Sequence, residues 1–173
     1  ASGASQVTAR AWGDGISQDF ENVDSGSAAV VNNGDVSFAG TAQATVGEGY
    51  ASAWVNADAI DQEIDVDQAS GLSAIVSATN SGSLTASGSA TAVATYGGVL
   101  AEATAAGFEQ DAYGGKTASS VSATNLGDVT VMASAQATLQ SGTYAGAYGN
   151  AVGIAQYAAG GSTMPYGQSA SAF

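Results

Sequence analysis

The densest group of side chains able to do chemistry is a short run in which acidic residues alternate with other residues. Its acidic members are Asp61, Glu63, Asp65 and Asp67. On an extended strand these four carboxylates share one face at intervals of roughly 6.5 to 7 Å. Carboxylate oxygens are ligands that Ca²⁺ prefers, so the run is a candidate calcium site. The spacing also fits a solvated acidic face that blocks unwanted pairing of a strand edge, and both interpretations stay open.

Most other catalytic chemistry is excluded by composition. The chain of 173 residues contains no His and no Cys, which removes Ser-His-Asp and Cys-His catalysis, His-ligated zinc and thiolate chemistry. The full motif Gly-x-x-x-x-Gly-Lys-Ser/Thr of phosphate-binding loops does not occur in the sequence. A carboxylate pair that cleaves a glycosidic bond is the remaining enzymatic route. We expect no enzyme, and calcium is the one candidate cofactor.

The net charge of the chain limits the classes of partner that it can bind. The formal net charge is −13, and Arg10 and Lys116 are the two basic residues. Two cations cannot build the basic patch that nucleic acid needs, and an anionic membrane surface is disfavoured for the same reason. No apolar run is long enough to cross a bilayer. The chain begins Ala1-Ser2-Gly3 without Met, as it would after signal-peptide removal, so we expect a secreted or cell-surface protein.

The chain repeats itself with a period of roughly 46 residues. One marker is Asn-x-Gly, which begins at Asn32, Asn80 and Asn125, with spacings of 48 and 45 residues. A second marker is a Gln that follows an Ala-x-Ala stretch, and its spacings are 44, 48 and 46 residues. Its members are Gln18, Gln62, Gln110 and Gln156. Two independent markers with one period indicate a repeat architecture.

Side chains alternate strictly after each Asn marker. Even offsets are Val, Leu, Phe, Ala or Gly, and odd offsets are mostly Ser, Thr or Gln. Period 2 held through three copies predicts strands with one buried face. Gly40 and Gly88 occupy the same offset in two copies, which predicts a bend or a close backbone approach.

These patterns predict an all-β fold, a β-solenoid of about 3.5 repeats in a single domain, residues 1–173. The repeats are approximately 8–49, 50–99, 100–143 and 144–173, and each is expected to form about two coils of ~23 residues. The Asn and Gln markers would stack into structural ladders, with the Gly after each Asn supplying a positive φ. The alternative is an antiparallel sandwich or barrel of about ten strands.

Two faces are candidate contact surfaces. Aromatic side chains recur opposite the Ala face of the Gln-marked segments, so that, counted from the first Ala, Trp12, Trp54 and Tyr148 take equivalent positions. They fit a second core layer, a subunit interface or a platform for sugars, and the candidate interface residues are Trp12, Trp54, Tyr50, Tyr144, Tyr148 and Phe173. Columns of Thr, Ser and Gln, such as Thr41, Ser89 and Ser134, have the look of ice-binding solenoids.

Through its Asn-x-Gly and Gln columns, the chain resembles the Ala/Gly/Ser-rich repeat proteins of bacterial extracellular adhesins and biofilm fibres. The resemblance implies a structural protein outside the cell. The chain starts and stops inside the repeat without a polar capping unit, so we expect unpaired terminal strands that join other copies head to tail into a homopolymeric filament. The alternatives are an adhesin module that binds calcium, a glycan or a cell surface, and an ice-binding solenoid.

Overall fold

The protein is all-β in the residues that the computed structural model describes, 5–66, 73–114 and 118–159. The seven strands are β1 (Ser5–Val23), β2 (Gly26–Asn32), β3 (Val36–Val66), β4 (Ser73–Asn80), β5 (Leu84–Tyr113), β6 (Ala118–Asn125) and β7 (Val129–Ala159). Within these ranges no helix is long and apolar enough to span a membrane. Asp67 and Phe173, two of the predicted site residues, lie outside the described residues.

The strands form two parallel sheets, in the orders β1-β3-β5-β7 and β2-β4-β6. Every described pairing is parallel, so the antiparallel pairing of the alternative prediction does not occur among these strands. Val36 pairs with Leu84, which pairs with Val129, one repeat further on each time. Each repeat therefore forms one layer. The expected division into two coils of ~23 residues is wrong, because the chain travels the full length of a repeat before it meets itself.

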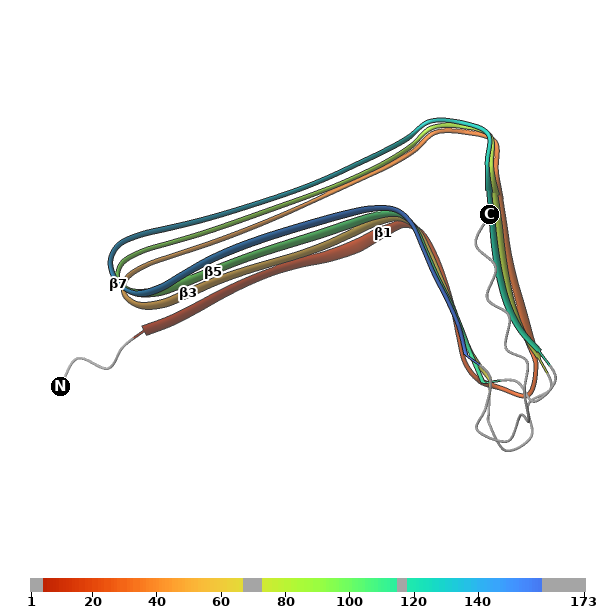
Figure 1. Ribbon diagram of the computed structural model, residues 1–173, viewed down its shortest axis with the longest axis horizontal. Coiled ribbons are helices and arrows are strands. Elements are labelled where there is room, and N and C mark those ends of the chain that lie inside the picture. The colour runs from red at the N-terminus through yellow and green to blue at the C-terminus, as the bar shows by residue number, and fades with distance from the viewer. Residues whose placement is uncertain (1–4, 67–72, 115–117, 160–173) are drawn as a thin grey trace.

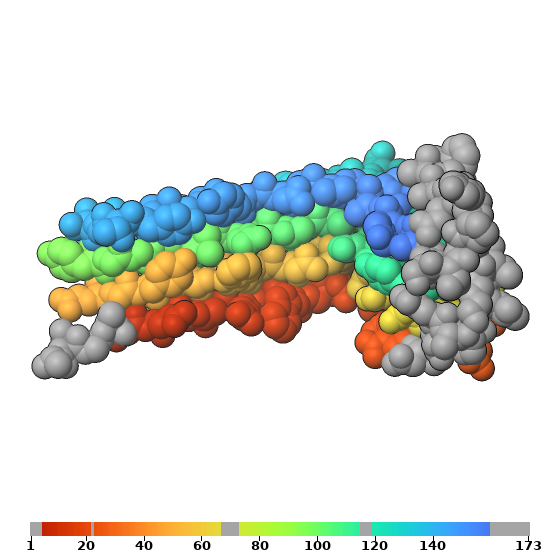
Figure 2. Space-filling view, turned by 60° about the horizontal axis from the view of Figure 1, so that its bottom comes forward, coloured from red at the N-terminus to blue at the C-terminus, as the bar shows by residue number. Residues whose placement is uncertain are grey.

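Each layer follows an L-shaped path with a long and a short limb (Figure 1). In the long limb, an outer wall (36–46, 84–94 and 129–139) and an inner wall (7–14, 51–58, 99–106 and 145–152) belong to one sheet that reverses at the tip. The short limb holds the ends of β1, β3, β5 and β7 opposite β2, β4 and β6. The layers appear as stacked bands, from β1 in red to β7 in blue (Figure 2).

Glycine is required where the path turns, because successive layers touch there. At the tip, Gly49 and Gly97 have φ values of 125° and 118°, which side-chain-bearing residues rarely adopt. At the outer corner, a Cβ added to Gly82 would lie 1.9 Å from the carbonyl oxygen of Gly34, and one added to Gly127 would lie 2.0 Å from that of Gly82. These corner glycines do not have positive φ, so that expectation is wrong. Interlayer contact, rather than backbone handedness, requires glycine at this corner.

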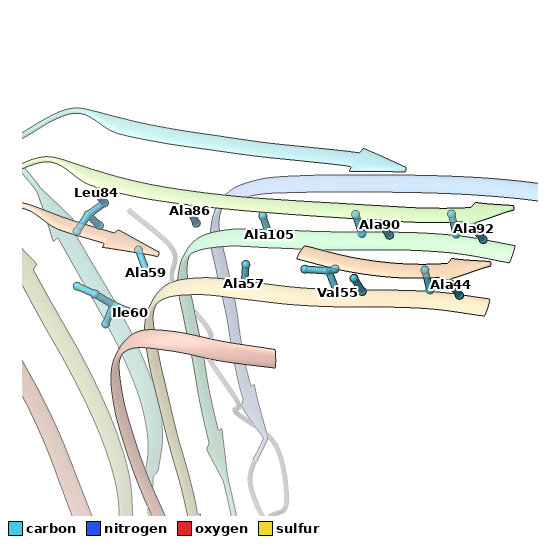
Figure 3. Close-up of a cluster of buried hydrophobic side chains, with 14 of the residues drawn as sticks. Ala44, Val55, Ala57, Ala59, Ile60, Leu84, Ala86, Ala90, Ala92 and Ala105 are labelled. Atoms are coloured by element: carbon cyan, nitrogen blue, oxygen red, sulfur yellow. The ribbon is translucent and has the colours of Figure 1, made fainter. Parts of the chain in front are cut away.

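The core is thin and built mainly from Ala. In β5, buried and half-buried residues alternate along the outer wall, as the period-2 pattern predicts. Ala44, Ala90 and Ala92 of the outer wall lie in the same cluster as Val55, Ala57 and Ala105 of the inner wall (Figure 3). A Cβ on Gly88 would lie 3.0 Å from the carbonyl oxygen of Thr104, which confirms the predicted close backbone approach there, whereas at Gly40 the nearest atom is Val55 Cγ1 at 2.8 Å. A second cluster, including Ile64, Val66 and Val76, fills the short limb.

The inner corner of the L changes which face of the strand is buried. Ala57 and Ala59 are buried on one side of the bend, and Ile60, Gln62 and Ile64 on the other. Ala59 pairs with no residue of β1 or β5, although Asp58 before it and Ile60 after it pair with both strands. A single residue at the bend thus shifts the alternation by one position, which brings outward-facing carboxyls from both limbs close together.

Candidate functional site

The Asn markers form a ladder at the outer corner, as predicted. Asn32 Nδ2 donates to Asn80 Oδ1 at 2.7 Å, and Asn80 Nδ2 donates to Asn125 Oδ1 at 2.8 Å. Each amide nitrogen also donates to the carbonyl oxygen of the Gly two residues later, which fixes the orientation of the amide. Backbone bonds continue through the corner, for example Ser81 N–H to Asn32 O at 2.9 Å. Hydrogen bonds therefore join successive layers through the corner as well as along the strands beside it.

The Gln markers form a second ladder inside the short limb, also as predicted. Gln62 donates to Gln18, Gln110 to Gln62 and Gln156 to Gln110, each from Nε2 to Oε1 at 2.8 Å. Gln62 and Gln110 are fully buried. Burial is tolerated because each of these amides both donates to and accepts from a neighbour.

The two ladders have opposite polarity. Asn amides donate toward later layers, and Gln amides donate toward earlier layers. The Gln ladder consequently ends on an unused acceptor, since Gln156 Oε1 is buried and has no hydrogen-bond partner within the described structure.

An acidic corner, formed by Asp14, Asp58, Asp61 and Glu109, lies at the inner bend. Asp14 and Asp58 share one column, and Asp61 and Glu109 share another. Asp58 is 1% exposed; its Oδ2 accepts from Asn56 Nδ2 at 2.8 Å, and its Oδ1 is buried without a partner among the described residues. Sequence reasoning identified Asp61 but missed the other three, because alternation alone does not reveal the bend that brings them together.

Electrostatics in this corner disfavour ionisation. Burial raises the pKa of Asp58 to about 6, and the carboxylates of Glu109 and Asp14 add to the rise. Burial also raises the pKa of Asp61 to about 7, with further contributions from Asp14 and Glu109. The pKa of Glu109 is raised mainly by burial, and next by Asp111. The corner therefore takes up protons near neutral pH.

The predicted calcium ligands occupy the adjoining strand. Asp61 and Glu63 are half-buried and Asp65 is exposed, on the face opposite Ile64 and Val66, as the alternation predicted. Within residues 5–66, 73–114 and 118–159, no three acidic side chains are grouped so that they could hold a metal ion. Carboxylates instead stack in register, Glu63 beside Asp111 and Asp61 beside Glu109.

The aromatic side chains share the outward face of the inner wall but not the predicted columns. Trp12 pairs with Asn56, while Trp54 stands between Arg10 and Glu102. Tyr148 lies in the Trp54 column. The predicted equivalence of Trp12 with Trp54 is wrong, because the segments from the first Ala to the Gln marker differ by two residues in length. The strands pair in the register that aligns the Gln markers. A shift of two residues keeps the face, so the prediction of a common face is confirmed.

Several of these rings are accessible. Trp12 is 70% exposed and Tyr148 56% exposed, so the described residues do not bury them in a second core layer. The Arg10 guanidinium lies 5.9 Å from the Trp12 ring centroid. The hydroxyls of Tyr144 and Tyr148 are 3.3 Å apart. Tyr50 and Trp54 are half-buried on the same face, where Trp54 Nε1 donates to Ser52 Oγ.

The polar columns of the outer wall are in register as predicted. Thr41 pairs with Ser89 and then with Ser134, and the Gln43 and Thr45 columns follow in the same way. Thr41 and Ser134 are exposed, and Ser89 is half-buried. This face is therefore regular, with Gln43 and Gln136 interrupting its small hydroxyl side chains.

Comparison of the chain with protein-family models, with curated proteins and with solved structures finds no match.

Proposed function

We propose that the protein is a β-solenoid that serves as a structural unit of an extracellular filament or adhesin, and that it assembles through the open edges of its terminal layers. The observation that carries the proposal is the interlayer registry of strands, amides and corner glycines. An Asn ladder, a Gln ladder and glycines without room for a Cβ all act between layers. Such a stack gains stability with each layer added, which suits a load-bearing or scaffolding role.

The terminal layers supply the means of growth. Among the strands that the structure describes, β1 and β7 each have a neighbouring strand on one side only. β7 extends over 31 residues without a charged side chain or a Pro, the residues by which proteins usually block such an edge. An edge of this kind favours addition of another strand.

Electron microscopy of the purified protein tests the proposal. We expect filaments whose fibre diffraction shows a spacing of about 4.7–4.8 Å along the axis, from stacked strands. Growth should depend on protein concentration. A protein that stays monomeric at high concentration over days would contradict the proposal.

A charge placed on the open edge provides a variant of this test. Ile154 is 39% exposed and stacks on Phe108, so Ile154→Lys puts an ammonium group on the inner edge of β7. We expect this variant to stay monomeric, because burying the charge against another strand is unfavourable. Gln140→Lys at the exposed tip makes the same addition away from that contact and should still assemble.

A second candidate function is glycan binding on the outward face of the inner wall. The exposed rings of Trp12 and Tyr148 favour it, because sugars stack on accessible aromatic faces. Binding of soluble oligosaccharides, measured by calorimetry, should be lost in Trp12→Ala. It should persist in Tyr96→Ala, which removes a 56% exposed ring elsewhere. Equal affinities of the two variants would contradict this candidate.

A further inference from the structure

The two ends of the layer stack are complementary, and we propose that they join in one defined register: the 144–159 part of β7 pairs in parallel with β1 of a second copy, Gln18 on Gln156. The inference rests on the proposed function and specifies its contact. It concerns which edges meet, in which direction and at which residues.

The Gln ladder carries the first step. Its three internal contacts all run from Nε2 of the later layer to Oε1 of the earlier one at 2.8 Å. Gln156 Oε1 is the one ladder acceptor left buried without a partner in the described chain. Gln18 Nε2 at the opposite end makes a long contact of 3.4 Å to Ala29 O. A second copy placed on β7 would let Gln18 donate to Gln156 and repeat the internal geometry.

The register of the strands carries the second step. Because β1 pairs with β3, β3 with β5 and β5 with β7, residues of β1 belong to columns that continue into β7. Ala9 shares a column with Ala147, Ile16 with Ile154, and Gln18 with Gln156. The second copy would therefore place these three side chains of β1 on ones of the same type, whereas elsewhere the stacked residues differ in size, as with Phe20 on Ala158. Arg10 would lie over the exposed Tyr148, a favourable cation–π arrangement.

The unequal charge of β1 and β7 is the third argument, and it indicates which edge meets which. β7 has no charged residue, whereas β1 carries Arg10, Asp14, Asp19 and Glu21. Pairing of β1 with β7 sets these charges against a neutral strand. Pairing of β1 with another β1 would bring acidic edges together, and pairing of β7 with β7 would oppose two Gln156 acceptors. Only the head-to-tail contact avoids both penalties.

The contact is limited to the inner edge. With β1 of the second copy on 144–159, the outer-wall segment 36–46 of that copy stands two layers above 129–139. Within the described chain, one strand position stays open in the outer wall and one in the β2-β4-β6 sheet, so the register is determined by the inner wall and by its continuation along the short limb.

Cysteine cross-linking tests the register, and the chain has no cysteine of its own. Ser17 and Ala155 share a column, so a disulfide between Ser17→Cys on one copy and Ala155→Cys on another would join neighbouring strands about 4.8 Å apart, within the range that disulfides span. We expect covalent dimers on oxidising a mixture of the two single variants, and none with either variant alone. Tyr157→Cys, two residues further along β7, would be about 8 Å away and is the register control.

The cross-linking and sedimentation results distinguish failure of the register from failure of assembly. Dimers from Ala155→Cys alone would mean that two β7 edges meet, and equal yields with Tyr157→Cys would mean that the register is not fixed. Either result overturns the inference while leaving assembly intact. Absence of any assembly by sedimentation would overturn the proposed function and the inference with it.

Gln18→Glu tests the hydrogen bond itself. The carboxylate still accepts from Gln62 Nε2 inside the chain but offers no donor to Gln156. We expect a slightly lower melting temperature, because the 3.4 Å contact to Ala29 O is lost, and a critical concentration for assembly raised about tenfold or more. Gln43→Glu, on the exposed outer wall, makes the same charge change and should assemble normally. Equal critical concentrations of the two variants would overturn the assigned contact.

Discussion

At the scale of single residues, the corner glycines are required by the layer beneath them. The Cβ of an alanine at position 82 would overlap the Gly34 carbonyl, with its oxygen at 1.9 Å and its carbon at 2.4 Å. Backbone atoms cannot move aside as a side chain can, so the two layers would have to separate at the corner. That separation would lengthen the Asn32–Asn80 contact of 2.7 Å.

We therefore expect Gly82→Ala to lower the free energy of unfolding by about 2–4 kcal/mol in urea titrations. Gly34→Ala is the matched control, since the same turn in the first layer has its nearest contact at 3.9 Å, from Asn32 Oδ1. The control should change stability by less than about 0.5 kcal/mol. Similar losses in both variants would mean that the corner does not depend on interlayer contact.

The acidic corner makes stability depend on pH. Asp58 and Asp61 have folded pKa values of about 6 and about 7, above the ordinary value of 3.8. Between about pH 4 and 7 the folded state therefore binds more protons than the unfolded state, and the free energy of unfolding falls as pH rises. We expect a decrease of about 1–3 kcal/mol from pH 5 to pH 8 in urea titrations, after allowance for solvent screening.

Asp58→Asn should flatten this profile and raise stability at pH 8. An amide keeps an oxygen for the Asn56 donor and removes the buried charge. Asp65→Asn removes an exposed carboxylate of the same strand and is the control. Stability that stays constant or increases from pH 5 to pH 8 in the unmodified protein would contradict the assignment.

At the scale of elements, the Gln ladder couples four strands through three hydrogen bonds. Gln110 is its buried centre, donating to Gln62 and accepting from Gln156. Replacement by Met preserves length but leaves Gln62 Oε1 and Gln156 Nε2 without their ladder partner. Because unsatisfied buried polar atoms are costly, we expect Gln110→Met to destabilise by about 2–4 kcal/mol in urea titrations. Gln136→Met, on the exposed outer wall, should have little effect, and a comparable loss there would contradict a ladder role.

The elements also show how far the sequence alone could lead. Alternation after each Asn predicted the strands, and the shared period predicted the columns of Asn32 and Gln18, because both follow from which side chains are buried. The bend at Ala59 was missed, although the other three copies carry a Gly three residues before the Gln marker, at Gly15, Gly107 and Gly153. The length of a layer was not predictable, because alternation reports a buried face and says nothing of where the chain turns back.

At the scale of the whole molecule, charge opposes the stacking that hydrogen bonds favour. The chain carries a net charge of −13, and several carboxylates repeat in adjacent layers, such as Asp14 with Asp58 and Glu63 with Asp111. Adjacent strands are about 4.8 Å apart, so these like charges repel strongly in the folded protein and less in the unfolded chain. Cations should therefore stabilise the fold, and the question is whether they act by general screening or by occupying a site.

We expect the melting temperature to rise with NaCl from about 10 mM to 500 mM, because the Debye length shortens from about 30 Å to below 8 Å over that range. At equal ionic strength, Ca²⁺ and Mg²⁺ should stabilise alike if they act by screening, since the described carboxylates repeat in columns along the layers. A calcium site at the acidic run predicts instead a saturable rise with Ca²⁺ that Mg²⁺ does not reproduce. That rise would be lost in Asp61→Asn and kept in Asp128→Asn, which alters an exposed carboxylate at the outer corner. Thermal melts of these variants in matched salts therefore separate diffuse screening from a bound ion.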